Sequence, residues 1–192
     1  MSEVAGLVLA AGAGRRFGAR PKQLADLLGR PLLEWSVRAA CAVEQLRRVV
    51  VVLGSDAEEI RAGVDLGRAE VVVCERWRDG QSASLRAGLT KLAGARSVVV
   101  TLGDAPLVTP EVIGLFVDAP PRSRAVYGGR PGHPVVLGPD EIDAAIGIAG
   151  DRGARDLLRD GRLIEVGHLC CGRDVDTQQD LEKISDAARA VL

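Results

Sequence analysis

Aromatic residues are scarce in this chain, which has two Trp, two Phe and one Tyr among its 192 residues. So few aromatic side chains leave little stacking surface for single-stranded nucleic acid. No charge of one sign dominates either, because 25 Lys and Arg residues face 26 Asp and Glu residues. Without a basic field for a nucleic-acid backbone, we expect no nucleic-acid partner. Any bound anion must be met by a local cluster of cations.

Cysteine and long apolar runs are also limited. The four cysteines (Cys41, Cys74, Cys170 and Cys171) show no C-x-x-C spacing, which favours reduced thiols. No run approaches the roughly 18 apolar residues of a membrane span. The first arginines follow the short apolar run 4–13 rather than precede it, which is the reverse of a secretion signal. We therefore expect a cytoplasmic protein with no membrane partner.

The remaining composition predicts one α/β domain. A length of 192 residues with 47% hydrophobic residues is enough for one full core. Short Val-rich runs alternate with helix-length segments, which is typical of a mainly parallel sheet with helices on both faces. We expect strands at 4–10, 49–53, 71–74 and 97–101, with helices at 31–43, 56–63 and 82–92. The less regular second half predicts helices at 110–116, 140–146, 152–159 and 178–191, strands at 125–127, 135–137 and 163–166, and an extended piece at 174–175.

A glycine-rich loop follows the first strand. Its glycines (Gly12, Gly14 and Gly18) allow backbone N–H groups to approach phosphate oxygens. The spacing differs from the dinucleotide pattern G-x-G-x-x-G, because Phe17 stands where the third glycine is needed, and no Walker A loop is present. The same loop carries four cations, Arg15, Arg16, Arg20 and Lys22. This concentration of positive charge in a nearly neutral chain predicts a triphosphate site.

Five motifs then resemble one family. The stretch 9–22 resembles the signature L-A-A-G-x-x-x-R-x-G-x-x-K of nucleotidyltransferases with a glycosyltransferase-A-like Rossmann fold. The segments W-R-D-G-Q-S-A-S-L-R-A-G-L, L-G-D-A-P-L, P-G-H-P-V with G-D-R-G-A-R, and D-V-D-T follow in the family's order. Within that superfamily, the chain is most similar to the molybdenum-cofactor cytidylyltransferases and the related guanylyltransferases.

The resemblance implies a fold and a reaction. The fold would be a single Rossmann-like domain of the nucleotide-diphospho-sugar transferase type, with a nucleotide-binding half at 1–104 and an acceptor-binding half at 105–192. The reaction would move CMP from Mg·CTP to the terminal phosphate of a molybdopterin-type cofactor and release pyrophosphate. Alternatives are a sugar or alditol phosphate as acceptor, GTP or ATP as donor, or a non-catalytic maturation chaperone that serves a molybdenum-enzyme apoprotein.

Two carboxylates are expected to hold a divalent ion. Asp104 follows a buried strand at its carboxyl end, where α/β sheets place their ligands. Mg²⁺ prefers one or two carboxylates together with phosphate oxygens and water. The resemblance implies Asp104 and Asp176 as the ligands of Mg²⁺, with Mn²⁺ as an alternative, while a turn aspartate and a helix cap are the structural alternatives. It also implies that Lys22 and Arg16, with Arg15 beside them, act as catalytic residues by neutralising charge on the phosphoryl oxygens.

The resemblance also implies which residues bind the nucleotide. They are Leu9, Ala10, Ala11, Gly12, Ala13, Gly14, Arg15, Gly18, Gly80, Ser82 and Ser84. In the family the form L-A-A-G accompanies cytidine, and physically the Cβ of Ala11 narrows the room for a purine. Such a one-methyl difference is worth only about 1 to 3 kcal/mol, so CTP is favoured over GTP without excluding it. Helix capping is the alternative role for Ser82 and Ser84.

The acceptor is expected in the second half of the chain. His133, Asp151 and Arg155 belong to the matching motifs and are implied to bind it. The alternatives are a loop hydrogen bond for His133 and a helix-capping or solvated role for Arg155.

Overall fold

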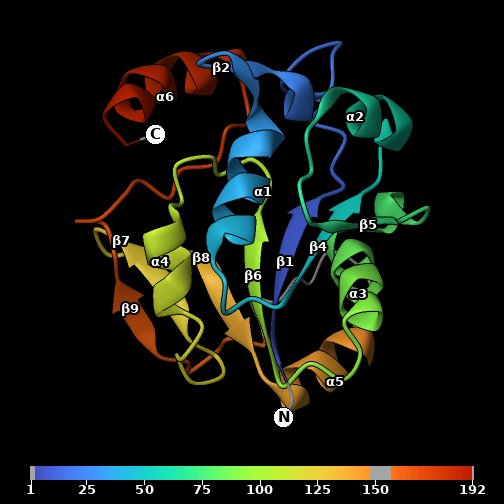
Figure 1. Cartoon of the computed structure of the whole chain (residues 1–192), viewed down its shortest axis with the longest axis vertical. Coiled ribbons are helices and arrows are strands. Elements are labelled where there is room, and N and C mark those ends of the chain that lie inside the picture. Colours follow the sequence, from blue (N-terminus) through green and yellow to red (C-terminus); the bar gives the residue numbers. More distant parts are fainter. Residues whose placement is uncertain (1–2, 148–156, 192) are drawn as a thin grey trace.

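The computed structural model describes residues 3–147 and 157–191 of the chain (Figure 1). A seven-stranded sheet runs through the molecule in the order β5-β4-β1-β6-β8-β7-β9. Its parallel part consists of β1 (Val4–Ala10), β4 (Arg48–Leu53), β5 (Glu70–Val73) and β6 (Ser97–Leu102). All seven residues of β1 are buried, because a central parallel strand is covered on both faces. The predicted α/β fold with a mainly parallel sheet is confirmed.

Helices cover both faces of the sheet. On one face α1 (Leu32–Ala42), α2 (Ala57–Gly63) and α4 (Pro110–Leu115) pack in one hydrophobic cluster. On the other face α3 (Gln81–Lys91) and α5 (Pro139–Gly147) pack in a second cluster. Successive residues of a strand point to opposite faces of the sheet, so the same strands contribute apolar side chains to both clusters.

The last helix, α6 (Gln178–Val191), lies across the end of the molecule toward which β1 points (Figure 1). Its residues Ile184 and Ala188 join a third cluster with Phe17 of the glycine loop and Val175. Thr177 begins the helix through a reciprocal cap: its hydroxyl accepts from the Asp180 N–H at 3.2 Å, and the Asp180 carboxylate accepts from the Thr177 N–H at 2.9 Å. Asp176 is therefore not the cap of this helix.

The second half differs in detail from the sequence expectation. The strands β7 (Arg124–Tyr127) and β8 (Arg130–Leu137) are joined by two residues only, so the expected long turn is wrong. Gly128 and Gly129 have φ of 57° and 80°, which suits a two-residue hairpin. β8 pairs antiparallel with both β6 and β7, and β9 (Leu163–Glu165) pairs parallel with β7 at the edge of the sheet.

Several predicted boundaries are corrected. α1 starts one residue after Pro31, and α3 starts at Gln81 with Gly80 as its N-cap and no side-chain cap, so Ser82 does not cap it. The predicted helix 152–159 lies mostly outside the described residues, and its described part, 157–159, is a turn. The piece 174–175, predicted only as extended, lies outside the sheet, and its Val175 N–H donates to the Asp104 carbonyl at 2.8 Å.

Four short elements escaped the sequence analysis. They are the 3₁₀ turns η1 (Lys22–Leu24) and η2 (Trp77–Asp79) and the small ladder of β2 (Asp26–Leu27) and β3 (Arg30–Pro31). They escape because two or three residues carry no readable periodicity.

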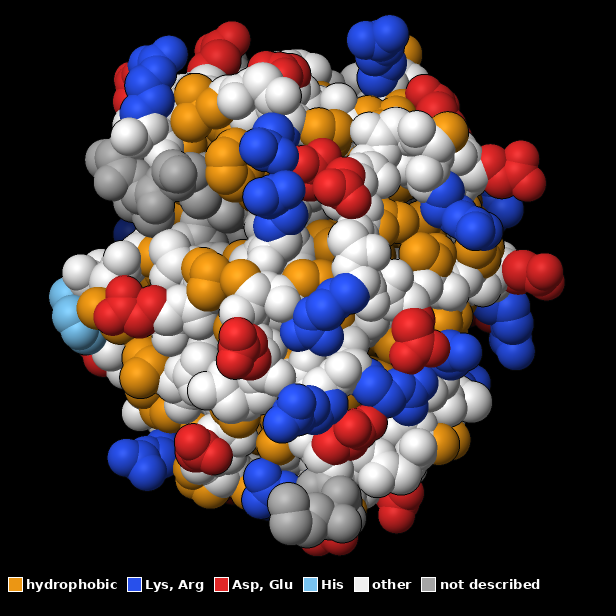
Figure 2. Space-filling view, viewed as in Figure 1, with side chains coloured by type: hydrophobic (Ala, Val, Ile, Leu, Met, Phe, Trp, Pro, Cys, Tyr) orange, Lys and Arg blue, Asp and Glu red, His pale blue; other side chains and the backbone are white. Residues whose placement is uncertain are grey.

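Surface and cysteine features agree with the composition. In Figure 2 cationic and anionic side chains are interspersed over the visible face. All four cysteines are free thiols. Among the helices of the described residues, none has both the length and the apolar character needed to cross a bilayer.

Candidate functional site

The site lies at the carboxyl ends of β1 and β6, which are adjacent parallel strands with Leu9 paired to Leu102. The glycine loop continues from β1, and Asp104 follows β6. A first cavity of about 210 Å³ forms between them. It is lined by Leu9, Ala10, Gly12, Gly14, Arg15, Arg16, Lys22, Gln23, Leu32, Gly103, Asp104 and Asp176.

A second, larger cavity of about 670 Å³ adjoins the first. Leu9, Gly12, Gly14, Arg15 and Asp104 line both. The second cavity adds Ala11, Ala13, Trp77, Arg78, Gly80, Gln81, Ser84, Leu102 and Asp174. The two cavities together form one elongated site along the glycine loop.

Lys22 lies between two carboxylates. Its side chain is buried, and its ammonium contacts Asp104 Oδ2, the Val175 carbonyl oxygen at 3.2 Å and Asp176 Oδ1 at 3.4 Å. Arg16 holds the other oxygen of Asp176 at 2.9 Å from an exposed position. The structure therefore joins the two expected cations to the two expected carboxylates.

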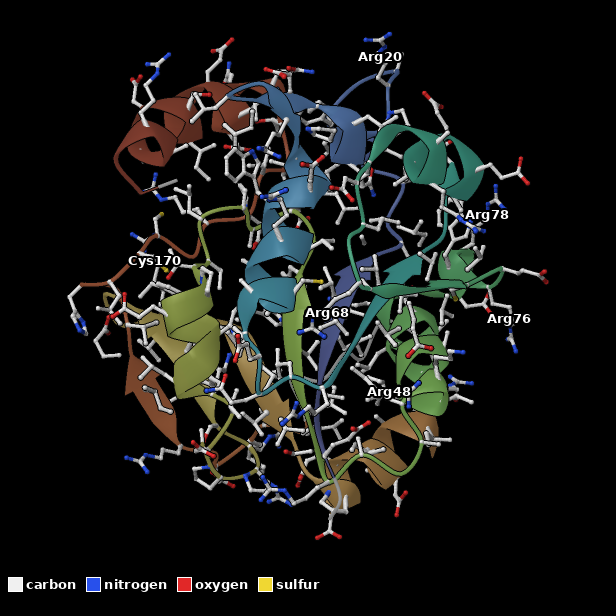
Figure 3. All side chains as sticks on the ribbon, viewed as in Figure 1. Arg20, Arg48, Arg68, Arg76, Arg78 and Cys170 are labelled. Atoms are coloured by element: carbon white, nitrogen blue, oxygen red, sulfur yellow. The ribbon has the colours of Figure 1, made fainter. Side chains whose placement is uncertain are left out.

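The cation cluster is smaller than the sequence indicates. Arg15, Arg16 and Lys22 line the first cavity. Arg20 projects from the loop into solvent (Figure 3) and lines neither cavity. It follows that three of the four predicted cations meet at the site.

Asp174 is a residue that the sequence analysis missed. Desolvation raises the pKa of its carboxyl, and the neighbouring charges of Asp104 and Asp176 raise it further, to about 7, while Lys22 lowers it. The carboxylates of Asp104, Asp174 and Asp176 therefore lie close enough to influence one another beside Lys22. The motif D-V-D-T contained the signal, because two aspartates two residues apart in an extended segment lie close in space.

The residues fit a divalent ion that is bound jointly with a nucleotide. Among the described residues, no group of three or more His, Cys, Asp and Glu is arranged to hold an ion by itself. Asp104 and Asp176 nevertheless face one cavity, and the Lys22 ammonium contacts both, which shows that a cation is accommodated there. Two carboxylates completed by phosphate oxygens and water suit Mg²⁺ or Mn²⁺.

The other end of the second cavity is built on η2 and α3. Trp77 packs against Gly54, where an added Cβ would lie 2.6 Å from both the Trp77 Cβ and the Ala11 carbonyl oxygen. Trp77 therefore packs next to the glycine loop at Ala11. The Arg78 guanidinium lies 4.4 Å from the centre of the Trp77 ring.

Two predicted nucleotide-binding residues lie elsewhere. Ser82 is buried beside Cys74 and Arg86 in a separate hollow, because the helix turns it away from its neighbour Ser84. Gly18 lines neither cavity. The remaining predicted nucleotide-binding residues line one cavity or both.

His133 lies next to this site but not in it. A small cavity of about 60 Å³ is lined by His133, Arg124, Gln81, Leu9 and four further apolar residues. Because Leu9 and Gln81 also line the second cavity, the two spaces adjoin. The other two predicted acceptor residues, Asp151 and Arg155, lie outside the described residues.

Comparison with known proteins identifies the family. Residues 6–166 match the sequence model described as the MobA-like NTP transferase domain. The chain belongs to the MobA-like NTP transferase family. The resemblance to nucleotidyltransferases that the motifs indicate is thereby confirmed.

Two relatives of this MobA-like NTP transferase are named for different activities. Nicotine blue oxidoreductase of Paenarthrobacter nicotinovorans is 33% identical over 94% of this chain and 96% of its own length. 2-C-methyl-D-erythritol 4-phosphate cytidylyltransferase of Rubrobacter xylanophilus is 38% identical over 77% of this chain, which spans 62% of that relative.

A solved structure supports the same fold. Rv0371c from Mycobacterium tuberculosis H37Rv superimposes with a TM-score of 0.85 and 29% identity, over 96% of this chain and 98% of that one. A second structure of Rv0371c is a complex with manganese.

Proposed function

We propose that this MobA-like NTP transferase moves CMP from CTP to the terminal phosphate of a molybdopterin-type acceptor and releases pyrophosphate. The observation that carries the proposal is the position of Lys22, whose ammonium is held by Asp104 and Asp176 beside a glycine loop at the carboxyl end of β1. This arrangement supplies positive charge, carboxylates for a divalent ion and backbone N–H groups in one place.

The chemistry needs positioning and charge neutralisation. An oxygen of the acceptor phosphate attacks the α-phosphorus of CTP and forms the new P–O bond. The bond from that phosphorus to the oxygen that bridges to the β-phosphorus breaks, and pyrophosphate leaves with the electron pair. Lys22 and Arg16 bind the phosphoryl oxygens as their charge grows, and no covalent protein nucleophile is required.

A divalent ion, Mg²⁺ or alternatively Mn²⁺, would be held by Asp104 and Asp176 and would supply further charge neutralisation. The contacts of Lys22 with both carboxylates support this assignment. The manganese complex of Rv0371c shows that a structural relative binds a divalent metal. Asp104→Asn is expected to abolish the Mg²⁺-dependent turnover, measured as pyrophosphate release, and an unchanged metal dependence would place the ion elsewhere.

We propose CTP as the nucleotide. Ala11 lines the second cavity together with Gly80, Gln81 and Ser84, so its Cβ limits the width available to the base. A relative named as a cytidylyltransferase supports the same choice.

We further propose that residues 1–104 bind the nucleotide and residues 105–192 the acceptor. The cavity beside His133 and Arg124 supports this division, because the second half supplies both of these side chains and the cavity adjoins the nucleotide site. Asp151 and Arg155 complete the acceptor site in this proposal. Free cysteines support a cytoplasmic location, and a molybdenum-enzyme apoprotein would receive the product.

The test of the donor is a thermal-shift panel with CTP, GTP, ATP, UTP and NAD, each with and without Mg²⁺. A ligand at about 100 times its dissociation constant stabilises the folded state by about 2.7 kcal/mol. CTP with Mg²⁺ is expected to give the largest shift. A larger shift with GTP or ATP would contradict the choice of base, and no shift with any triphosphate would contradict the transferase itself.

The test of the acceptor is pyrophosphate release with CTP and different phosphate compounds. A molybdopterin-type acceptor is expected to support turnover, whereas a sugar or alditol phosphate is not. Equal turnover without a pterin would contradict the proposed acceptor. CTP binding without turnover on any acceptor would instead favour the chaperone role.

A redox function is the second candidate, because the relative that aligns over 96% of its own length is named nicotine blue oxidoreductase. The loop argues against it, since Phe17 replaces the third glycine of a dinucleotide fingerprint. NADH or NADPH oxidation with a dye acceptor, in the absence of any triphosphate, would establish this alternative.

A further inference from the structure

Gln23 is a buried polar residue against the glycine loop that the proposed chemistry does not use. Its side chain is 4% exposed, and it lies in η1 directly after Lys22. Its amide nitrogen donates to the carbonyl oxygens of Ala10 and Gly12, both at 2.9 Å. A carboxamide nitrogen carries two protons, so one side chain satisfies two loop carbonyls.

The neighbouring loop carbonyls are also directed into the protein. The Leu9 oxygen accepts from the Gly103 N–H at 2.9 Å, and the Ala11 oxygen accepts from the Ser55 N–H at 3.2 Å. Carbonyl oxygens carry partial negative charge and would repel a phosphate. Four successive carbonyls at the end of β1 and the start of the loop, those of residues 9–12, are therefore held by protein donors, two of them by Gln23 alone.

Holding a carbonyl also directs an N–H group. The C=O of Ala10 and the N–H of Ala11 belong to one planar trans peptide and point in opposite directions, as do the C=O of Gly12 and the N–H of Ala13. Gln23 thus turns both N–H groups away from itself. Ala11 and Ala13 both line the second cavity.

We propose that Gln23 is a positioning residue that orients the Ala11 and Ala13 N–H groups toward the triphosphate. This inference rests on the proposed function, because the triphosphate is the ligand of that loop. Lys22 and Gln23 are adjacent in η1, so this turn carries both the ammonium and the amide that holds the loop. The turn is closed by the Ala25 N–H, which donates to the Lys22 carbonyl at 3.0 Å. One turn fixes both the catalytic cation and the anion-binding backbone.

The test compares Gln23→Met with the unsubstituted full chain. Met fills a similar volume but donates no hydrogen bond, so both carbonyls lose their partner. Isothermal titration measures the affinity for CTP with Mg²⁺ and, separately, for inorganic tripolyphosphate with Mg²⁺, and urea denaturation without ligand measures stability. We expect both affinities to fall about tenfold or more, in line with the loss of hydrogen bonds to a charged ligand.

Two further variants separate positioning from stability. Arg68→Met removes a side chain that donates to four backbone carbonyls, those of Cys41, Val43, Leu46 and Arg47, and lines neither cavity. It is expected to lower stability without changing either affinity. Gln23→Asn has a shorter side chain that reaches fewer carbonyls, so it is expected to bind CTP and tripolyphosphate with intermediate affinity. If Gln23→Met does not fold, Gln23→Asn takes its place in the comparison.

Each outcome decides the question. Unchanged affinities in Gln23→Met or Gln23→Asn would overturn the positioning role, as would an equal loss of affinity in Arg68→Met. If the unsubstituted chain binds tripolyphosphate but not CTP, the proposed donor is wrong and the tripolyphosphate arm still tests Gln23. If it binds neither, both the proposed function and the role of Gln23 are overturned.

Discussion

Lys22 shows how one residue depends on distant parts of the chain. It is 8% exposed, and its ammonium is balanced by Asp104 and Asp176, which lie 82 and 154 residues further along. A buried ammonium needs such partners, because an unpaired charge away from water is strongly unfavourable. The same interactions aim it into the cavity that the glycine loop encloses.

Replacing this ammonium is the sharpest test at the residue scale. Lys22→Ala is expected to lower kcat by about 10²- to 10³-fold, the usual loss when one group that stabilises transition-state charge is removed. KM for CTP is expected to change less, because Arg16 and the loop N–H groups remain. Steady-state kinetics measures both constants, with Arg20→Ala as the control because Arg20 lines neither cavity. Wild-type turnover in Lys22→Ala would remove it from the phosphate site.

At the scale of elements, α3 lies against the sheet at a glycine. A Cβ on Gly88 would clash with Leu7 of β1 and lie 2.9 Å from Val52 of β4. Gly88→Ala is therefore expected to destabilise the fold by about 1 to 3 kcal/mol through overpacking. Gly114 in α4 is the matched control, since an added Cβ there meets nothing within 4 Å. Gly114→Ala is expected to stabilise the fold by about 0.5 to 1 kcal/mol. Urea denaturation of both variants checks that the free energy of unfolding falls in Gly88→Ala and rises in Gly114→Ala.

The β7–β8 hairpin is held by a carboxylate of β9. Glu165 accepts from the N–H groups of Gly128 at 2.9 Å, Gly129 at 3.2 Å and Gly167 at 2.9 Å. The Gly128, Gly167 and Gly129 N–H groups, in that order of importance, lower the pKa of Glu165. Because the folded pKa lies below the unfolded one, this stabilisation is present above the unfolded pKa and is lost as the pH falls through the folded pKa.

Glu165→Gln tests that linkage. The variant should be less stable than the unsubstituted chain at pH 7, and the difference should shrink as the solution is acidified below the usual range of a glutamate. Urea denaturation of both proteins from pH 7 to about pH 3 follows the difference. A constant difference across this range would show that the Glu165 charge does not hold the turn.

At the scale of the whole molecule, the cations and carboxylates expected to bind the phosphates and the metal ion come from three separated parts of the chain. These are the loop after β1, the turn after β6, and the segment before α6. The third hydrophobic cluster joins the first and last of them through Phe17, Val175 and Ile184. Binding at this site should therefore order all three parts together.

Hydrogen exchange measures that coupling. CTP with Mg²⁺ is expected to slow amide exchange in residues 9–18, 103–105 and 174–178 together. β9 at the edge of the sheet is the internal control and should exchange at an unchanged rate. Protection confined to 9–18 would mean that the nucleotide does not bridge the two halves of the chain.

The prediction of the fold depended on long, regular patterns. The strands β1, β4 and β6 were found almost residue by residue, because buried parallel strands appear as continuous Val-rich runs. The long turn before residue 135 was wrong because its glycines and prolines resemble a loop, whereas pairing with β7 extends β8 back to Arg130.

The amino-acid sequence by itself determined the fold class, the loop that lines the cavities, and the residue types that gather there. These features are local, since a Val-rich run, a glycine loop and an aspartate after a strand can each be read within a few neighbouring residues. Only the tertiary structure decided that Lys22 lies between Asp104 and Asp176, that Ser82 faces another hollow, and that Gln23 holds the glycine loop. Those facts depend on contacts between residues far apart in the chain and on the side of an element that packing buries, and no local pattern records either.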